Sequence, residues 1–125
     1  MAAIKSKDTK PEALVRGLLH RLGYRYRLHD RTLPGSPDIV FPGRKKVIFV
    51  NGCFWHRHRC HRGQRMPASR IGYWKPKLEG NKTRDAQHRR ELRRAGWTVL
   101  TIWECQTGPN RVEELKARLL SFLDP

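Results

Sequence analysis

Residues 37–51 read Pro-Asp-Ile-Val-Phe-Pro-Gly-Arg-Lys-Lys-Val-Ile-Phe-Val-Asn and contain a clear pair of strand signals. Two short apolar runs, residues 38–41 and 46–50, flank a Pro-Gly pair at Pro42 and Gly43. Because Pro and Gly favour turns between extended segments, we predict two successive strands. The second run is continuously apolar, which indicates a central strand that is buried on both faces.

Helical and strand-like patterns surround this pair. A capping box from Thr9 to Glu12, apolar residues at helical spacing and Gly23 predict a helix over residues 10–22. Apolar and basic residues alternate over 24–28, which predicts a half-buried strand. Further on, we predict a polar helix over about 80–95, a buried strand over 97–103 and a last helix capped within residues 110–113.

The predicted order is helix, three strands, an irregular insert over residues 51–77, helix, strand and helix. This order describes an α/β fold with a mixed central sheet flanked by helices. A chain of 125 residues suits one domain, so we predict a single domain over residues 1–125, with residues 1–8 as an N-terminal arm.

The chain is strongly basic. It has 27 Lys and Arg against 11 Asp and Glu, a net charge of +16 that favours a polyanionic partner, with nucleic acid ahead of a membrane surface. Between Asp38 and Glu79 the sequence contains no carboxylate, and aromatic residues are interspersed with Arg and Lys, which indicates a phosphate-facing surface rather than a merely solvated one. No segment is apolar enough to span a bilayer and no signal-peptide pattern opens the chain, so we expect a cytoplasmic protein.

The three cysteines suggest a metal site. Cys53 and Cys60 lie close together, whereas Cys105 lies just past the strand predicted over 97–103. Three thiolates and one imidazole satisfy tetrahedral zinc, and the nearby histidines His56, His58 and His61 compete for the fourth place. The alternative is that these cysteines are buried free thiols that pack as small apolar side chains.

Asp38 is the candidate anchor for a catalytic cation. A phosphodiester is anionic and resists attack, so its hydrolysis calls for a hard cation such as Mg²⁺, which prefers oxygen ligands. The usual nuclease hairpin pairs Pro-Asp with an acid-x-Lys strand, but here the second strand ends in Val50-Asn51-Gly52. The general base therefore stays open: His56 can deprotonate water, or it can bind zinc or a phosphate. Asp38 can also be an ordinary turn residue after Pro37.

The segment Gly52-Cys53-Phe54-Trp55-His56 resembles the Vsr family of mismatch-nicking endonucleases. The resemblance covers nearly the whole chain, from about Ile4 to Phe122. Further matching stretches are Lys7 to Glu12, Leu33 to Asp38, Tyr73-Trp74, Asn81 to Asp85, Gly96-Trp97 and Trp103-Glu104-Cys105.

This resemblance implies a restriction-endonuclease-like fold of the PD-(D/E)xK type with two metal sites. It implies a structural zinc held by Cys53, His58, Cys60 and Cys105, and Mg²⁺ held by Asp38 and the backbone carbonyl of Val50. His56 would be the general base and Glu12 would support it. Some members carry a second active-site histidine where this chain has Asn51, which cannot transfer a proton as histidine does.

The resemblance also implies how DNA is bound. Phe54, Trp55 and Trp74 stand at positions that wedge into DNA beside a T:G mismatch, with core packing as the alternative. Basic and polar contacts to DNA are expected from Lys5, Lys7, Arg57, Arg59 and Asn81.

Three functions follow as hypotheses. The first is a nucleoid-associated, monomeric endonuclease that nicks one strand at T:G mismatches left by deaminated 5-methylcytosine, alongside mismatch-repair proteins. The second is a nuclease of the same fold with another DNA target. The third is a non-catalytic, zinc-dependent DNA-binding module.

Overall fold

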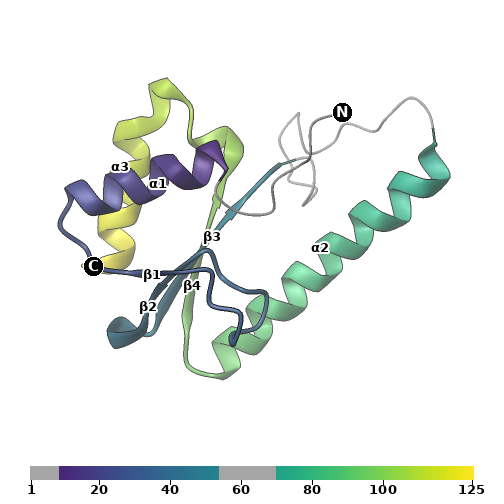
Figure 1. The fold of residues 1–125 in the computed structure, drawn as a ribbon, viewed down its shortest axis with the longest axis horizontal. Helices are drawn as coiled ribbons and strands as arrows, with labels where there is room; N and C mark the ends of the chain where they lie inside the picture. Colours follow the sequence, from purple (N-terminus) through teal and green to yellow (C-terminus); the bar gives the residue numbers. More distant parts are fainter. Residues whose placement is uncertain (1–8, 54–69) are drawn as a thin grey trace.

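The computed structural model describes residues 9–53 and 70–125. The element order is helix, three strands, helix, strand and helix, which confirms the predicted order (Figure 1). The elements are α1 (Lys10–Arg21), β1 (Arg27–Leu28), β2 (Ile39–Phe41), η1 (Pro42–Arg44), β3 (Lys46–Asn51), α2 (Ile71–Arg94), β4 (Thr98–Trp103), η3 (Glu104–Gln106), η4 (Pro109–Arg111) and α3 (Val112–Leu123). None of the helices within residues 9–53 and 70–125 has the length and hydrophobicity of a membrane-spanning segment.

The strands form one mixed sheet in the order β1-β2-β3-β4. β1 pairs with β2 and β2 with β3 in antiparallel fashion, whereas β3 and β4 run parallel. β3 therefore has a partner on each side, as its continuous apolar run predicts. Because Asn51 pairs with Trp103, the carboxyl ends of β3 and β4 lie side by side.

Two layers of helix cover the sheet (Figure 1). α1 and α3 pack on one face, where Val15 and Leu19 of α1 and Leu119 of α3 join the largest buried cluster with sheet residues such as Ile48. On the other face Leu92 of α2 packs against Val40 and Val47. Alternate residues of β2 and β3 thus enter different cores, as strand geometry requires.

The hairpin between β2 and β3 closes as the sequence predicts. Pro42 and Gly43 form the 3₁₀ turn η1, and Lys45 follows it with a positive φ of 56°. The chain then enters β3 at Lys46, and its first residue pairs with Phe41. This tight connection sets the register that brings the start of β2 opposite the end of β3.

Four local predictions are corrected. The first strand covers Arg27–Leu28 instead of residues 24–28, because Tyr24 and Tyr26 pack edge-on against Phe41, with ring centroids 6.3 and 6.2 Å apart. β4 is only partly buried, because it has a single partner strand and lies at the edge of the described sheet.

The helix predicted over 80–95 begins earlier, at Ile71, and includes Pro76. Its first turns contain Gly72 and Pro76, which disfavour a helix interior, so the sequence pattern did not predict helix there. The last helix starts after the η4 turn with Arg111 as N-cap and no side-chain cap hydrogen bond, so Asn110 does not cap it.

Candidate active site

Helix α1 brings a buried carboxylate to the sheet. Thr9 caps the helix, and its Oγ1 accepts the Glu12 backbone N–H at 3.3 Å, as the predicted capping box requires. Glu12 is buried, and its carboxylate lies 2.8 Å from Nε2 of His29 and 3.3 Å from a guanidinium nitrogen of Arg16. A buried carboxylate is costly unless it is paired, so these contacts hold Glu12 in place.

Asp38 lies where β2 begins and is bonded to both neighbouring strands. Its Oδ2 accepts the backbone N–H of Val50, near the end of β3, at 2.7 Å. Its own backbone carbonyl accepts the N–H of His29, just past β1, at 3.0 Å. The position of this carboxyl group is therefore determined by the register of three strands.

Glu12, His29 and Asp38 form a compact cluster. One potential ligand atom from each lies within 4.8 Å of the other two. Burial raises the pKa of Asp38 from its ordinary 3.8 to about 7, the Val50 N–H opposes that shift, and the charge of Glu12 adds to it. Two carboxyl groups this close repel when both are ionised, and a divalent cation removes that repulsion. The donor set of carboxylate oxygens with one imidazole fits such an ion.

His29 was not among the predicted site residues. It follows a two-residue strand and belongs to no recognisable metal-binding spacing. Its place in the cluster follows from strand pairing. Leu28 pairs with Ile39, so His29, the next residue, falls opposite Asp38. Only the short length of β1 and its register, which the sequence does not reveal, place this histidine in the cluster.

Asn51, predicted to act in catalysis, is buried at the end of β3 with 6% exposure. It lines a small space beneath α2 together with Phe49, Asp85 and His88. Since successive strand residues point to opposite faces, Asn51 lies on the α2 side of the sheet, whereas Val50 packs toward α1 and α3.

Two of the four predicted zinc ligands meet at the ends of the parallel strands. Cys53 follows β3 and is fully buried, and Cys105 lies in the turn after β4. The Cys105 N–H donates to Cys53 Sγ at 3.4 Å, which confirms that these strand ends are neighbours. His58 and Cys60 lie outside the described residues.

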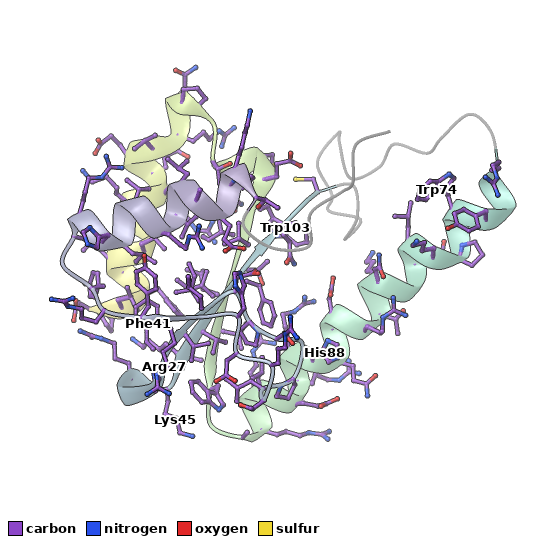
Figure 2. All side chains as sticks on the ribbon, in the orientation of Figure 1. Arg27, Phe41, Lys45, Trp74, His88 and Trp103 are labelled. Atoms are coloured by element: carbon purple, nitrogen blue, oxygen red, sulfur yellow. The ribbon has the colours of Figure 1, made fainter. Side chains whose placement is uncertain are left out.

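Aromatic and basic side chains gather at the N-terminal end of α2. The rings of Tyr73 and Trp74 meet edge to face with centroids 5.2 Å apart, and Lys77 Nζ lies 5.5 and 5.8 Å from the two rings. Arg70 lies over Tyr73 at 5.1 Å, and Tyr73 is 50% exposed. Trp74 stands on the part of α2 that extends away from the sheet (Figure 2).

Only some of the other predicted DNA-contacting residues fall within the described residues. Asn81 lies on α2, where its side-chain oxygen accepts a hydrogen bond from Arg84. The remaining predicted contacts and the proposed base lie outside the described residues; they are Lys5, Lys7, Phe54, Trp55, His56, Arg57 and Arg59.

A mixed sheet with a paired-carboxylate cluster beside its central strand, in a chain of net charge +16, has the features of a metal-dependent nuclease. The family model described as DNA mismatch endonuclease Vsr matches residues 1–62. With the relatives described next, this match shows that the chain belongs to the Vsr family.

Relatives match over most of the chain. The type II nicking enzyme V.XorIIP of Xanthomonas oryzae is 50% identical over 125 residues, which are 100% of this chain and 90% of the relative. The type II nicking enzyme V.NmeAIP of Neisseria meningitidis is 43% identical, over 85% of this chain and 75% of the relative. The DNA mismatch endonuclease Vsr of Escherichia coli is 41% identical, over 84% of this chain and 67% of the relative.

The chain is therefore a DNA-cleaving endonuclease. This conclusion decides against the non-catalytic DNA-binding module. The identity of the DNA target is a separate question, because the names of these relatives differ in what they say about it.

Proposed function

We propose that this endonuclease nicks one strand of double-stranded DNA at a T:G mismatch, by hydrolysis that depends on Mg²⁺. The nick would start very short patch repair of deaminated 5-methylcytosine. The observation that carries the catalytic part is the Asp38 carboxyl, held by the Val50 N–H beside buried Glu12. The mismatch target is supported by the relative named DNA mismatch endonuclease, which is 41% identical.

Four residues at or near the cation site have distinct tasks in this proposal. Asp38, with the Val50 backbone carbonyl, would hold Mg²⁺, which when bound neutralises phosphate charge and lowers the pKa of water. Glu12 lies next to Asp38 and adds negative charge that favours the cation. Arg16 partners Glu12 and balances this charge on the α1 side. His56 is the proposed base.

A structural zinc is the second part of the proposal. Cys53, His58, Cys60 and Cys105 would hold it, and the N–H of Cys105 donating to Cys53 Sγ is the kind of contact that stabilises a thiolate ligand. The ion would join the chain that leaves β3 to the turn that follows β4. We propose it as structural because four protein ligands leave no open coordination position.

Helix α2 is the proposed DNA-binding element. Its basic residues are Lys75, Lys77, Lys82, Arg84, Arg89, Arg90, Arg93 and Arg94. Such a series suits the phosphate backbone, and the exposed Tyr73 with its neighbour Trp74 offers ring faces for unstacked bases. Phosphate contacts would position the duplex, and the rings would act at the disturbed base pair.

A second target is favoured by the names of other relatives. The Xanthomonas oryzae and Neisseria meningitidis relatives are named type II nicking enzymes. A nicking enzyme that reads a sequence would cut a matched duplex as well as a mismatched one. The two candidate functions therefore differ in the ratio of cleavage of mismatched duplex to cleavage of matched duplex.

The test compares cleavage of two duplex pools that have the same design and differ only in one fixed T:G or C:G pair, with and without Mg²⁺. Since the recognition sequence is unknown, the pair is set within a randomised context and nicked products are sequenced. Mismatch-directed cleavage predicts nicks beside T:G only. Equal nicking of the C:G duplexes would favour the sequence-reading alternative, and Asp38→Asn serves as the inactive control.

A further inference from the structure

We propose that His29 is a third protein ligand of the catalytic cation, together with Asp38 and Glu12, and that its nitrogen shifts the preference of the site from Mg²⁺ toward Mn²⁺. This inference rests on the proposed function, because it concerns the cation held at Asp38. It assigns a metal-selecting role to a side chain that sequence reasoning passed over.

The first support is placement. The imidazole of His29 lies 2.8 Å from Glu12 Oε2, and one nitrogen falls within 4.8 Å of ligand atoms of both carboxylates. Ligand atoms around a divalent ion bound at about 2.0–2.2 Å lie at most slightly more than 4 Å apart, so small side-chain rotations suffice. Without a cation, the hydrogen bond to Glu12 keeps two of these donors together.

The second support is the backbone of His29. Its φ is +49°, a left-handed conformation that non-glycine residues seldom adopt and that costs free energy. The N–H of His29 is fixed by the Asp38 carbonyl at 3.0 Å, so the strained residue is joined to the very residue that anchors the cation. This conformation turns the chain out of β1 and directs the side chain toward Glu12.

The third support is the position of His29 between Glu12 and the solvent. The His29 side chain is 20% exposed, whereas that of Glu12 is 2% exposed, so the histidine stands on the solvent side of the buried carboxylate. A histidine that served only to neutralise Glu12 would duplicate Arg16, which already lies 3.3 Å from the same oxygen. A cation entering from solvent would meet His29 and Asp38 with Glu12 beneath them.

The chemical consequence concerns which metal is bound. Mg²⁺ prefers oxygen ligands alone. Mn²⁺ also suits oxygen ligands, but it is the first ion of the transition-metal series whose affinity extends to nitrogen donors, so an added imidazole favours it over Mg²⁺. A site with two carboxylates and one imidazole therefore gains more affinity for Mn²⁺ than for Mg²⁺. Removing the imidazole should lower the ratio of Mn²⁺ to Mg²⁺ affinity by about tenfold, while Asp38 still binds both ions.

The test uses the full chain with His29→Asn, because asparagine tolerates a positive φ and so keeps the turn while removing the nitrogen ligand. His20→Ala is the control, since His20 is an exposed histidine on α1. Affinities for Mn²⁺ and Mg²⁺ are measured by calorimetry without DNA, and Mn²⁺-bound samples are examined by pulsed electron paramagnetic resonance for coupling to ¹⁴N. A thermal melt without added metal checks that His29→Asn folds.

We expect ¹⁴N coupling in the parent protein and in His20→Ala, and its loss or marked reduction in His29→Asn, together with the lowered affinity ratio. Unchanged ¹⁴N coupling and an unchanged ratio in folded His29→Asn would overturn the inference. Asp38→Asn distinguishes a failure of this inference from a failure of the proposed function. If Asp38→Asn bound both metals with the affinity of the parent protein, Asp38 would not be a metal ligand and the proposed function would fail with it.

Discussion

Asp38 Oδ2 accepts a 2.7 Å hydrogen bond from the backbone N–H of Val50, which fixes the carboxyl group at the start of β2 to the end of β3. The same carboxyl is withdrawn from water and adjoins Glu12, so its pKa is raised to about 7. The protein without metal thus carries an acid that is costly to ionise, in a place where an ionised form would bind a cation. This conflict yields two predictions.

Asp38→Asn should abolish DNA nicking and yet stabilise the metal-free protein at pH 8. Asparagine can still accept the Val50 N–H but carries no buried charge. The pKa of Asp38 is about 7 in the folded protein and 3.8 ordinarily, so protonation of Asp38 stabilises the fold. This stabilisation is complete below pH 3.8 and is lost as the pH rises through about 7. The expected gain at pH 8 is about 2–4 kcal/mol in the free energy of unfolding, measured by urea denaturation.

That gain should shrink as the pH is lowered from about 7 to about 4, since Asp38 is then protonated in the folded protein. Asp30→Asn is the matched control: Asp30 is exposed in a turn where its Oδ1 accepts the Thr32 N–H at 2.9 Å, which asparagine can also do. Its effect should stay within about 0.5 kcal/mol. A destabilised Asp38→Asn at pH 8 would show that the carboxylate is well solvated or paired.

Mg²⁺ should raise the melting temperature more at pH 8 than at pH 6. A proton and the cation compete for Asp38, and below a pKa of about 7 the proton prevails. The apparent affinity for Mg²⁺ should fall by up to about tenfold per pH unit below that value. Calorimetric titration at several pH values checks this slope, and equal affinity at pH 6 and pH 8 would contradict it.

The topology was predictable because its determinants are local. The apolar runs around the Pro42-Gly43 turn define β2 and β3, and the Leu and Val residues of α1 and α3 repeat at helical spacing. By contrast, the first turns of α2 contain Gly72 and Pro76, which disfavour helix, and the short β1 depends on Tyr24 and Tyr26 packing against Phe41. These features arise from tertiary contacts that a local pattern does not encode.

In the candidate site too, some residues could be predicted from local sequence and others could not. Asp38 was predicted from its place after Pro37, and the meeting of Cys53 with Cys105 from the strands that precede them. Glu12 was identified through family resemblance as a support for His56, which lies outside the described residues, so that role stays a prediction. Within the described residues, Glu12 also contacts His29 and Arg16. His29 was missed because its role depends on the register of β1 against β2, which residue spacing does not reveal.

Cys105→Ser should abolish the proposed zinc binding and destabilise the protein. The backbone N–H of Cys105 already donates to Cys53 Sγ at 3.4 Å, so the two residues are neighbours at the strand ends, as a shared ion requires. Loss of one of four ligands should lower the zinc content, measured by mass spectrometry, from one per chain to well below half, with a loss of several kcal/mol of stability. Exposed His20→Ala should keep its zinc, and a Cys105→Ser protein with full zinc content would refute the ligand set.

Trp74→Ala and Lys77→Ala should weaken DNA binding in different ways, although the two side chains are neighbours at 5.8 Å. Trp74 offers a stacking face, so its loss should cost about 1–3 kcal/mol of binding to mismatched DNA and leave the salt dependence unchanged. Lys77 offers a charge, so its loss should reduce the slope of log affinity against log salt by about 0.9 and affect matched and mismatched duplexes equally. Fluorescence anisotropy over a series of salt concentrations measures both quantities. If Trp74→Ala weakened matched and mismatched DNA by the same factor, the ring would contact the duplex without probing the mismatch, because stacking on an unpaired base gains energy only where a base pair is already disrupted.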